Sequence, residues 1–208
     1  MSRNEKSWQP PTEVNLRKTA WEPGTLLAPV PVVMVTCQSA AGRRNIVTVA
    51  WTGTVCSTPP MVGMSLTPER FSHSMIQETG EFVINLPSTL QAKATDLCGV
   101  ISGRDKDKFR LTGLTPVPAK EVRPPLIAEC PVHLECKVRQ SLSLGSHTLF
   151  LAEVVAVQIA ERLITGKGRF AVERADLMAF AHGQYFALGK VLGHFGFSIK
   201  GQNPTAKG

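Results

Sequence analysis

Polar side chains interrupt a segment whose other residues are typical of a buried β-strand. Between the turn residues 41–44 and the prolines at 59–60, β-branched residues predominate, and such residues favour a pleated strand. The polar side chains of the segment belong to Asn45, Thr48, Thr52 and Thr54. Each would cost free energy if it were buried without a hydrogen-bond partner. We therefore expect them to face solvent or to contact a polar ligand that lies against the sheet.

A helix start follows this segment and contains groups that could bind phosphate. Thr67, Pro68 and Glu69 have the order of an N-cap hydroxyl, a first-turn proline and an acid, which predicts a helix from Thr67 to about residue 79. Arg70 and Ser72 lie in its first turns, where free N–H groups and the helix dipole favour anions. The residues alone leave two alternatives, a phosphate site or a surface charge beside a solvent-facing hydroxyl, and they favour the second.

Two further segments contain candidate groups. The segment 102–109 includes Ser102, Gly103 and Lys108 among mixed charges and ends at Phe109, which offers an aromatic face; by itself this pattern is typical of a solvated loop. His147 stands where a turn enters a strand, and an imidazole there can donate a hydrogen bond or titrate near neutral pH. Most histidines in such places are structural.

The cysteines indicate neither a disulfide framework nor a metal site. There are five, an odd number, and they are widely spaced in mostly apolar surroundings: Cys37, Cys56, Cys98, Cys130 and Cys136. A disulfide-stabilised secreted domain has denser, paired cysteines, and a zinc site needs two clustered pairs of ligands. We expect free thiols, no bound metal, and small apolar packing roles for Cys56 and Cys98.

Composition and familiar motifs exclude several function classes. The net charge of +7 is dispersed and does not form a stripe, so we expect no nucleic-acid partner, whereas a small phosphate-bearing cofactor would benefit from it. No apolar run approaches the roughly 20 residues that span a bilayer, and no apolar stretch follows the basic start of the chain. We therefore expect a cytoplasmic protein. The sequence also lacks the glycine-rich nucleotide loops and the serine-hydrolase elbow.

The elements that must position these groups are mainly short strands. With 15 prolines and 17 glycines in 208 residues, we expect an all-β to α+β fold: a closed or partly open antiparallel barrel with short inserted helices. The alternation of apolar and polar residues over 132–139 predicts a strand with one face in the core and one face in water. The other predicted strands are 29–36, 45–56, 60–66, 81–86 and 146–157. The predicted helices are 67–79, ended by Gly80, and 90–98, ended by Gly99. The tail 185–198 is expected to pack along the barrel.

Several segments, taken in order, resemble the flavin reductase-like, flavoredoxin-type family of the FMN-binding split-barrel fold. The matching segments are Asn45-Ile-Val-Thr48, Val55-Cys-Ser-Thr-Pro-Pro-Met61, Gly80-Glu-Phe-Val-Ile-Asn-Leu86, Cys98-Gly-Val-Ile-Ser-Gly-Arg-Asp-Lys-Asp-Lys-Phe109, Gly113-Leu-Thr-Pro116, Ala128-Glu-Cys-Pro131 and Leu192-Gly-His-Phe-Gly-Phe-Ser198. The resemblance implies an N-terminal arm over 1–28, a split-barrel domain over 29–200, related to pyridoxine-phosphate oxidases, and a tail over 201–208.

The resemblance also implies a cofactor and its contacts. Members of the family are homodimers that bind FMN in a groove at the subunit interface. By this likeness Arg70 and Ser72 would hold the phosphate, which reverses the preference stated above, and the segments Ser102-Gly103 and Lys108-Phe109 would close over the flavin. The remaining implied contacts, to the ring or ribityl chain, come from Asn45, Thr48, Val49, Ala50, Trp51 and Thr52, with Cys56 near the pyrimidine side.

Two functions are compatible with this resemblance. The first is an NAD(P)H-dependent flavin reductase, which would supply reduced FMN to a partner oxygenase or another acceptor. The second is a flavoredoxin-like electron carrier, which keeps its FMN and exchanges electrons with another redox protein. Flavin reductases of this fold have a Gly-Asp-His turn near the nicotinamide, whereas this chain has Gly145-Ser146-His147. His147 is the candidate catalytic residue, although the missing aspartate counts against use of NAD(P)H.

Overall fold

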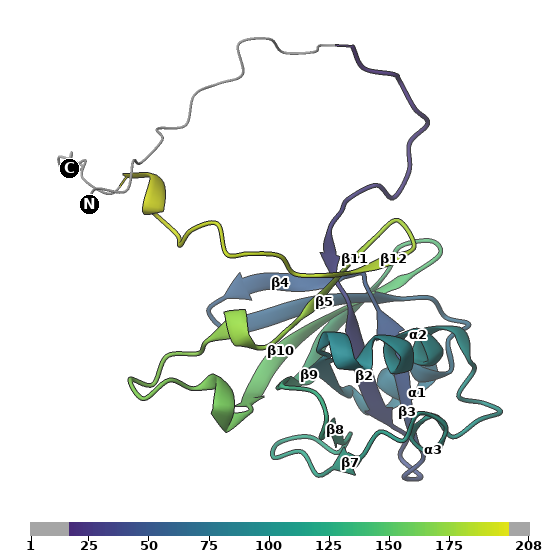
Figure 1. Cartoon of the computed structure of the whole chain (residues 1–208). Coiled ribbons are helices and arrows are strands. Elements are labelled where there is room, and N and C mark those ends of the chain that lie inside the picture. Colours follow the sequence, from purple (N-terminus) through teal and green to yellow (C-terminus); the bar gives the residue numbers. More distant parts are fainter. Residues whose placement is uncertain (1–16, 200–208) are drawn as a thin grey trace.

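The computed structural model describes residues 17–199 and is built around one antiparallel sheet of seven strands (Figure 1). The strand order is β3-β2-β6-β9-β10-β5-β4, and every neighbouring pair is antiparallel. This confirms the expected antiparallel, strand-rich fold with short helices. The strands span β2 Val33–Gln38, β3 Arg44–Val49, β4 Thr52–Ser57, β5 Pro60–Leu66, β6 Glu81–Leu86, β9 Val132–Ser143 and β10 Thr148–Ile159.

The prediction of one strand over 45–56 is wrong. The chain leaves β3 at Val49, bends at Ala50 and Trp51, and continues as β4, so the two halves of the predicted strand lie at opposite edges of the sheet. The backbone N–H of Ser65 donates to the Trp51 carbonyl at 2.9 Å, which holds the bend against β5. The sheet curls but does not close, and this bend connects its two edges.

Three short helices lie beside β3 and β2 (Figure 1). They are α1 Phe71–Thr79, α2 Ala92–Val100, preceded by the 3-10 turn η1 Thr89–Gln91, and α3 Lys108–Thr112. Gly80 ends α1 as predicted, with φ 67°, but α1 begins four residues later than predicted because Arg70 is extended. Gly99 lies inside α2, although we expected it to end the helix.

Two apolar clusters hold these elements together. The larger fills the concave side of the sheet and includes Phe82, Phe150 and Met64, with Met75 and Ile76 from α1 packed against them. Aromatic and aliphatic side chains of this size each stabilise a fold by roughly 1.5–3 kcal/mol when buried. A second cluster lies between β2, β3 and the α2–α3 region, and its members are Met34, Ile46, Cys98, Phe109, Leu114, Ile127 and Cys130.

The prediction that one face of residues 132–139 is wet holds only at its end, where Lys137 is partly buried and Arg139 is exposed. A loop covers the first half of that face. His133 and Glu135 are buried. The carboxylate of Glu135 accepts hydrogen bonds from the backbone N–H groups of Lys120 and Glu121, at 2.6–3.1 Å, and from the Gln158 amide at 2.7 Å. Burial alone raises the pKa of Glu135, but these hydrogen bonds outweigh it and lower the pKa below its ordinary value.

Replacement of Glu135 by alanine is expected to lower the free energy of unfolding at pH 7 by about 3 kcal/mol, because it removes a charged acceptor from buried donors. Urea unfolding measures this loss. Since the folded pKa is lowered, the contribution of Glu135 is complete above the unfolded pKa of about 4.3 and declines as the pH falls through the folded pKa. The matched variant Glu153→Ala breaks the exposed ion pair with Arg139 and should cost under about 1 kcal/mol. Equal losses in the two variants would contradict this account.

The remaining elements surround the sheet. β1 Val30–Pro31 pairs with β11 Met178–Ala181, which pairs with β12 Gln184–Ala187, and β7 Pro116–Val117 pairs with β8 Leu126–Ile127. Short 3-10 turns occur at η2 Glu161–Leu163, η3 Val172–Arg174 and η4 Phe197–Ile199. The tail predicted to pack along the barrel forms β12 over its first part, whereas residues 188–195 are exposed. Residues 17–28, the described part of the predicted arm, contain no helix or strand. The rest of the arm, residues 1–16, and the predicted tail, residues 201–208, lie outside the described residues.

Candidate functional site

Two adjoining cavities lie beside the bend between β3 and β4. The first, here called the polar groove, has a volume of about 270 Å³. The second, here called the aromatic cavity, has a volume of about 340 Å³, and Thr67 and Arg70 line both. The polar groove is also lined by Asn45, Val47, Glu69, Phe71, Ser72, residues 100–104 and Lys108; the aromatic cavity is also lined by Thr48, Val49, Ala50, Trp51, Ser65, Leu66, His147 and Phe180.

A hydrogen bond joins β3 to the first turn of α1 on the floor of the polar groove. The Asn45 side-chain amide donates to the Ser72 hydroxyl at 2.8 Å, and both residues are buried. Ser72 is therefore not the solvent-facing residue that the sequence alone favoured. Gly103 lies directly against Asn45, since a Cβ added at Gly103 would come within 2.0 Å of the Asn45 side-chain oxygen. The groove thus brings Asn45, Ser72 and Gly103 together from distant parts of the sequence.

Lys108 fixes the far wall of the groove. Its ammonium group is buried and donates to the carbonyls of Ile46 in β3 and Cys98 in α2, each at 2.7 Å. Burial lowers the pKa of Lys108, and the nearby positive charge of Arg70 lowers it further. Thr48 makes a second link to α2 through a hydrogen bond from its hydroxyl to the Thr95 carbonyl.

Two arginines, Arg70 and Arg104, line the polar groove, and Arg43 lies beside it. Arg70 is exposed and donates to the Gly99 carbonyl at 2.6 Å. Arg43 and Arg104 lie over the Phe71 ring, with 4.4 and 5.7 Å from each guanidinium carbon to the ring centroid, an arrangement that favours cations over an aromatic face. With Lys108, this end of the site has four basic side chains. It suits a phosphate group.

One carboxylate also faces the groove. Hydrogen bonds from its own backbone and from the Thr67 hydroxyl lower the pKa of Glu69, with a smaller contribution from the charges of His147 and His73. Glu69 is therefore ionised at neutral pH. The other charged side chains that line the groove, Arg70, Arg104 and Lys108, are basic, so the lining keeps a net positive charge.

The aromatic cavity presents flat apolar surface beside the backbone of the bend. The Trp51 side chain is 47% exposed, and its ring lies 4.5 Å from that of His147, centroid to centroid. The Ser146 hydroxyl and the His147 Nδ1 are 2.9 Å apart. The cavity can therefore contact a planar ligand, with an imidazole at one side.

Most residues that the sequence and the resemblance predicted line these cavities, but three do not. Thr52 lies just beyond the bend and donates its hydroxyl to the Gly63 carbonyl at 2.8 Å. Cys56 lies further along β4, with its thiol 3.5 Å from the Thr58 carbonyl, and lines neither cavity. Phe109 packs in the second apolar cluster and does not offer an open aromatic face. Thr52 and Cys56 were expected at the site because one continuous strand over 45–56 would carry them beside Asn45 and Thr48. They belong instead to β4, at the opposite edge of the sheet from β3.

The sequence did not single out Arg43, Arg104 or Phe71 as site residues. Arg43 belongs to the hairpin turn before β3, and Arg104 to the loop after α2, so nothing local indicates that they share an aromatic ring. The one available signal is the pair Arg43-Arg44 next to Asn45, which composition alone assigns to a solvated turn.

The cysteines are free thiols, as predicted, and Cys98 packs in the second apolar cluster, whereas Cys56 is half-buried and belongs to neither of the two clusters, so its predicted packing role is wrong. Within residues 17–199, no group of His, Cys, Asp and Glu side chains could hold a metal ion, and all five cysteines are free. Burial raises the pKa of Cys37 to about 12 and that of Cys98 to about 11, so these thiols are unreactive at neutral pH. In the same part of the chain, no helix has the length and hydrophobicity needed to cross a membrane.

Replacement of Gly103 by alanine is expected to lower the free energy of unfolding by about 1–3 kcal/mol, because the new methyl group must displace the buried Asn45 side chain. Thermal unfolding measures this change. Gly166→Ala is the matched control, since a Cβ there meets nothing within 4 Å. A Gly103→Ala protein as stable as the control would show that Asn45 can move at no cost.

Comparisons with known proteins agree with this architecture. A family model described as "Flavin reductase like domain" matches residues 26–189. The structure is similar to the flavoredoxin of Desulfovibrio vulgaris (Miyazaki F), with a TM-score of 0.82, 32% identity, and coverage of 88% of this chain and 100% of the other. The flavoredoxin of Methanosarcina acetivorans gives a TM-score of 0.81 and 25% identity over 88% of this chain and 98% of the other. The expected split-barrel architecture is confirmed by these likenesses.

A further relative is the reductase component of the 4-nitrophenol 4-monooxygenase/4-nitrocatechol 2-monooxygenase of Rhodococcus opacus. It is 31% identical over 111 residues, which cover 53% of this chain and 56% of the relative. The family model extends over most of the chain, from the segment before β1 to the segment after β12. The chain therefore belongs to the flavin reductase-like family.

Proposed function

We propose that the protein is an oxidoreductase that binds FMN and passes electrons through it, with NAD(P)H as the electron donor. The observation that carries this proposal is the junction of the two cavities at Arg70. One side of the junction is basic and hydroxyl-bearing, and the other is flat and apolar. FMN has the same division, with a phosphate at one end and a planar ring at the other.

The residues present fit this cofactor. Arg70 and the hydroxyls of Ser72 and Ser102 line the polar groove and would bind the phosphate. Thr48 and the backbone of residues 49–51 line the aromatic cavity and would contact the ribityl chain and the ring. Trp51 would cover the ring and exclude water from it.

The chemistry of the proposed reaction divides between cofactor and protein. Bound FMN supplies hydride and electron transfer. The protein would contribute orientation, because Asn45, Gly103 and Lys108 hold β3, α1 and α2 at a fixed separation. His147 would donate a hydrogen bond or a proton at the edge of the aromatic cavity, with its ring position fixed by Trp51 and Ser146.

A flavoredoxin-like electron carrier without NAD(P)H oxidation is the second candidate. Two observations favour it. The solved structure that is 32% identical to this chain, and that the match covers over its full length, is named a flavoredoxin. The turn before β10 has Ser146, where the flavin reductases of this fold have an aspartate. The reductase is favoured by His147, which remains in place beside the aromatic cavity, and by the relative named as a monooxygenase reductase component.

We further propose that the protein acts as a cytoplasmic homodimer. Exposed apolar side chains lie along β4 and the bend, including Trp51 and Val55, and a second subunit would cover them and complete the cofactor groove. A partner oxygenase or a redox protein would receive the electrons.

Anaerobic reduction separates the two candidates. The protein reconstituted with FMN is mixed with NADH or with NADPH, and the loss of the oxidised flavin absorption is followed. The reductase predicts reduction within seconds by at least one nucleotide, and steady-state oxidation that saturates with added FMN. Retention of tightly bound, oxidised FMN in the presence of both nucleotides would reject the reductase in favour of the carrier.

A further inference from the structure

The segment after β12 presents apolar side chains that the described part of its own chain does not cover. Residues 188–199 leave the body of the molecule and lead to η4 (yellow in Figure 1). Leu192 is 93% exposed, and Phe195 is fully exposed. Val191 and Phe197 are exposed as well. Exposed apolar side chains that cluster in this way are typical of a surface that contacts another molecule.

This segment has a local structure that keeps Phe195 outside. The backbone N–H of Phe197 donates to the His194 carbonyl at 2.9 Å, and the rings of these two residues lie 6.3 Å apart, centroid to centroid. Gly196 has φ 80°, a conformation that favours glycine. The Phe197 ring lies against Gly193, where an added Cβ would come within 2.6 Å of it. Phe197 is thus folded back on the segment, whereas Phe195 remains free to contact a second surface.

An apolar cavity without charge lies beside the bend between β3 and β4. This cavity, here called the neutral cavity, has a volume of about 430 Å³, and no charged side chain of the described residues lines it. Its walls include the exposed side chains of Leu27, Trp51 and Val55. Ala50, Trp51 and Ser65 line both the neutral cavity and the aromatic cavity. A segment that filled the neutral cavity would therefore close one side of the aromatic cavity.

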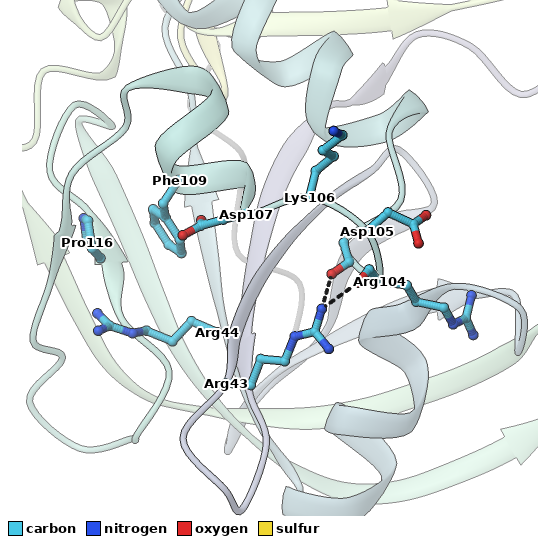
Figure 2. A pocket seen from close by; sticks show the side chains of 9 residues that line it. Arg43, Arg44, Arg104, Asp105, Lys106, Asp107, Phe109 and Pro116 are labelled. Carbon is cyan, nitrogen blue, oxygen red and sulfur yellow. Dashed lines mark hydrogen bonds between the residues drawn. The ribbon is translucent and has the colours of Figure 1, made fainter.

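Charge favours the neutral cavity over the basic one as the docking place of the segment. Residues 188–199 contain one lysine, one histidine and no acid. The cavity shown in Figure 2, next to the polar groove, is lined by three arginines and a lysine against two carboxylates. Arg43 is held there by hydrogen bonds to the carbonyls of Gly103 and Arg104, at 2.7 and 2.8 Å (Figure 2). This excess of positive charge would repel the segment, whereas the neutral cavity would not.

A second copy of the chain is the occupant that brings the two apolar surfaces together. In its own chain the segment leads away from the sheet, so that Phe195 and the neutral cavity are exposed at the same time (Figure 1). Two copies related by a twofold axis can exchange their segments, because each copy presents the same segment and the same cavity. The exchange would cover both surfaces in one closed dimer.

We propose that residues 188–199 of one protomer dock in the neutral cavity of a second copy, with Leu192 and Phe195 as the main contacts, and so complete the flavin site of that copy. The flavin part of this proposal rests on the proposed function, because it requires the flavin ring to occupy the aromatic cavity. The docking itself requires no flavin.

Photo-cross-linking of the full-length, flavin-free protein tests the docking. The variant Phe195→p-benzoylphenylalanine is irradiated, and its products are separated by denaturing electrophoresis and mapped by mass spectrometry. The proposal predicts a two-chain product in which position 195 is joined to a residue that lines the neutral cavity of the other chain. The matched control is Phe186→p-benzoylphenylalanine, since Phe186 is exposed on β12 and does not line the neutral cavity. It should give no product at the lining residues.

Paired alanine variants test the completion of the flavin site. Leu192→Ala with Phe195→Ala should raise the dissociation constant of the dimer by at least about 100-fold and lower the affinity for FMN by at least about tenfold. The matched control, Leu90→Ala with Phe186→Ala, removes the same types of side chain from exposed positions that line neither cavity. It should change either value by no more than about threefold. Analytical ultracentrifugation and flavin fluorescence measure these constants.

The possible failures are distinguishable. Cross-links within a single chain would assign the segment to its own neutral cavity and overturn the exchange, as would dimers of the Leu192 and Phe195 variant as stable as those of the control. Unchanged FMN affinity in weakened dimers would overturn the role of the segment in the flavin site. A parent protein that gives the two-chain product but binds no FMN would reject the proposed function alone. One that binds FMN without the two-chain product would reject the exchange alone.

Discussion

Replacement of both Arg70 and Ser72 by alanine is expected to lower the affinity for FMN by about 100-fold. Arg70 lies at the junction of the two cavities, and Ser72 lies on the floor of the polar groove. Two charge-assisted hydrogen bonds to a phosphate are together worth roughly 3 kcal/mol, which corresponds to this factor. Fluorescence titration of the flavin measures the change.

The same double variant also has a cost in stability. Ser72 is buried and accepts the Asn45 hydrogen bond, so its loss should lower the free energy of unfolding by about 1 kcal/mol while the protein remains folded. Arg162→Ala with Ser74→Ala is the matched control: Arg162 is exposed, and Ser74 is exposed on the same helix. An affinity equal to that of the control would remove the phosphate assignment.

Replacement of Lys108 by methionine is expected to lower the free energy of unfolding by about 3 kcal/mol. The substitution keeps an unbranched apolar chain of similar length but leaves the Ile46 and Cys98 carbonyls without their donor, and such buried acceptors cost roughly 1–3 kcal/mol each when unpaired. Because these carbonyls belong to β3 and α2, the groove should also lose its shape. FMN affinity should fall by at least tenfold.

Urea unfolding and flavin titration measure the two effects of Lys108→Met. Lys93→Met is the matched control, since Lys93 is exposed on α2 and its substitution should change stability by no more than about 0.5 kcal/mol. If Lys108→Met unfolded at the same urea concentration as this control, the buried ammonium group would not be the link between β3 and α2.

The sequence allowed most strands to be predicted, because their signals are local. The predicted strands 60–66 and 81–86 agree with β5 and β6, and the predicted strand 29–36 corresponds to β1 and β2, which belong to different sheets. Gly80 ends α1 as its conformational freedom predicts. Local alternation could not reveal the bend at residues 50–51, however, because the bend exists only where the two edges of the curled sheet approach each other.

The errors in burial have a similar cause. A lysine such as Lys108 is almost never fully buried unless it has partners, and its partners here come from β3 and α2. Glu135 is buried because the backbone N–H groups of Lys120 and Glu121, in the loop between β7 and β8, reach it. Long-range contacts of this kind leave no periodic pattern in the sequence.

The candidate site was predicted from two sources. The residues indicated a polar ligand against the sheet, and the resemblance to the flavin reductase-like family supplied the expectation that this ligand is FMN and that Arg70 and Ser72 hold its phosphate. Neither source indicated that Thr52 and Cys56 would lie beyond the bend, or that Arg43 and Arg104 would share the Phe71 ring.

Titration of the flavin-free protein with FMN tests the central claim most directly. The account predicts one FMN bound per chain, with a dissociation constant of about 1 µM or lower, a value that corresponds to about 8 kcal/mol of binding free energy, and a change in the flavin absorption bands as the ring enters the aromatic cavity. A protein that leaves the flavin spectrum and fluorescence unchanged at flavin concentrations up to about 100 µM would contradict it.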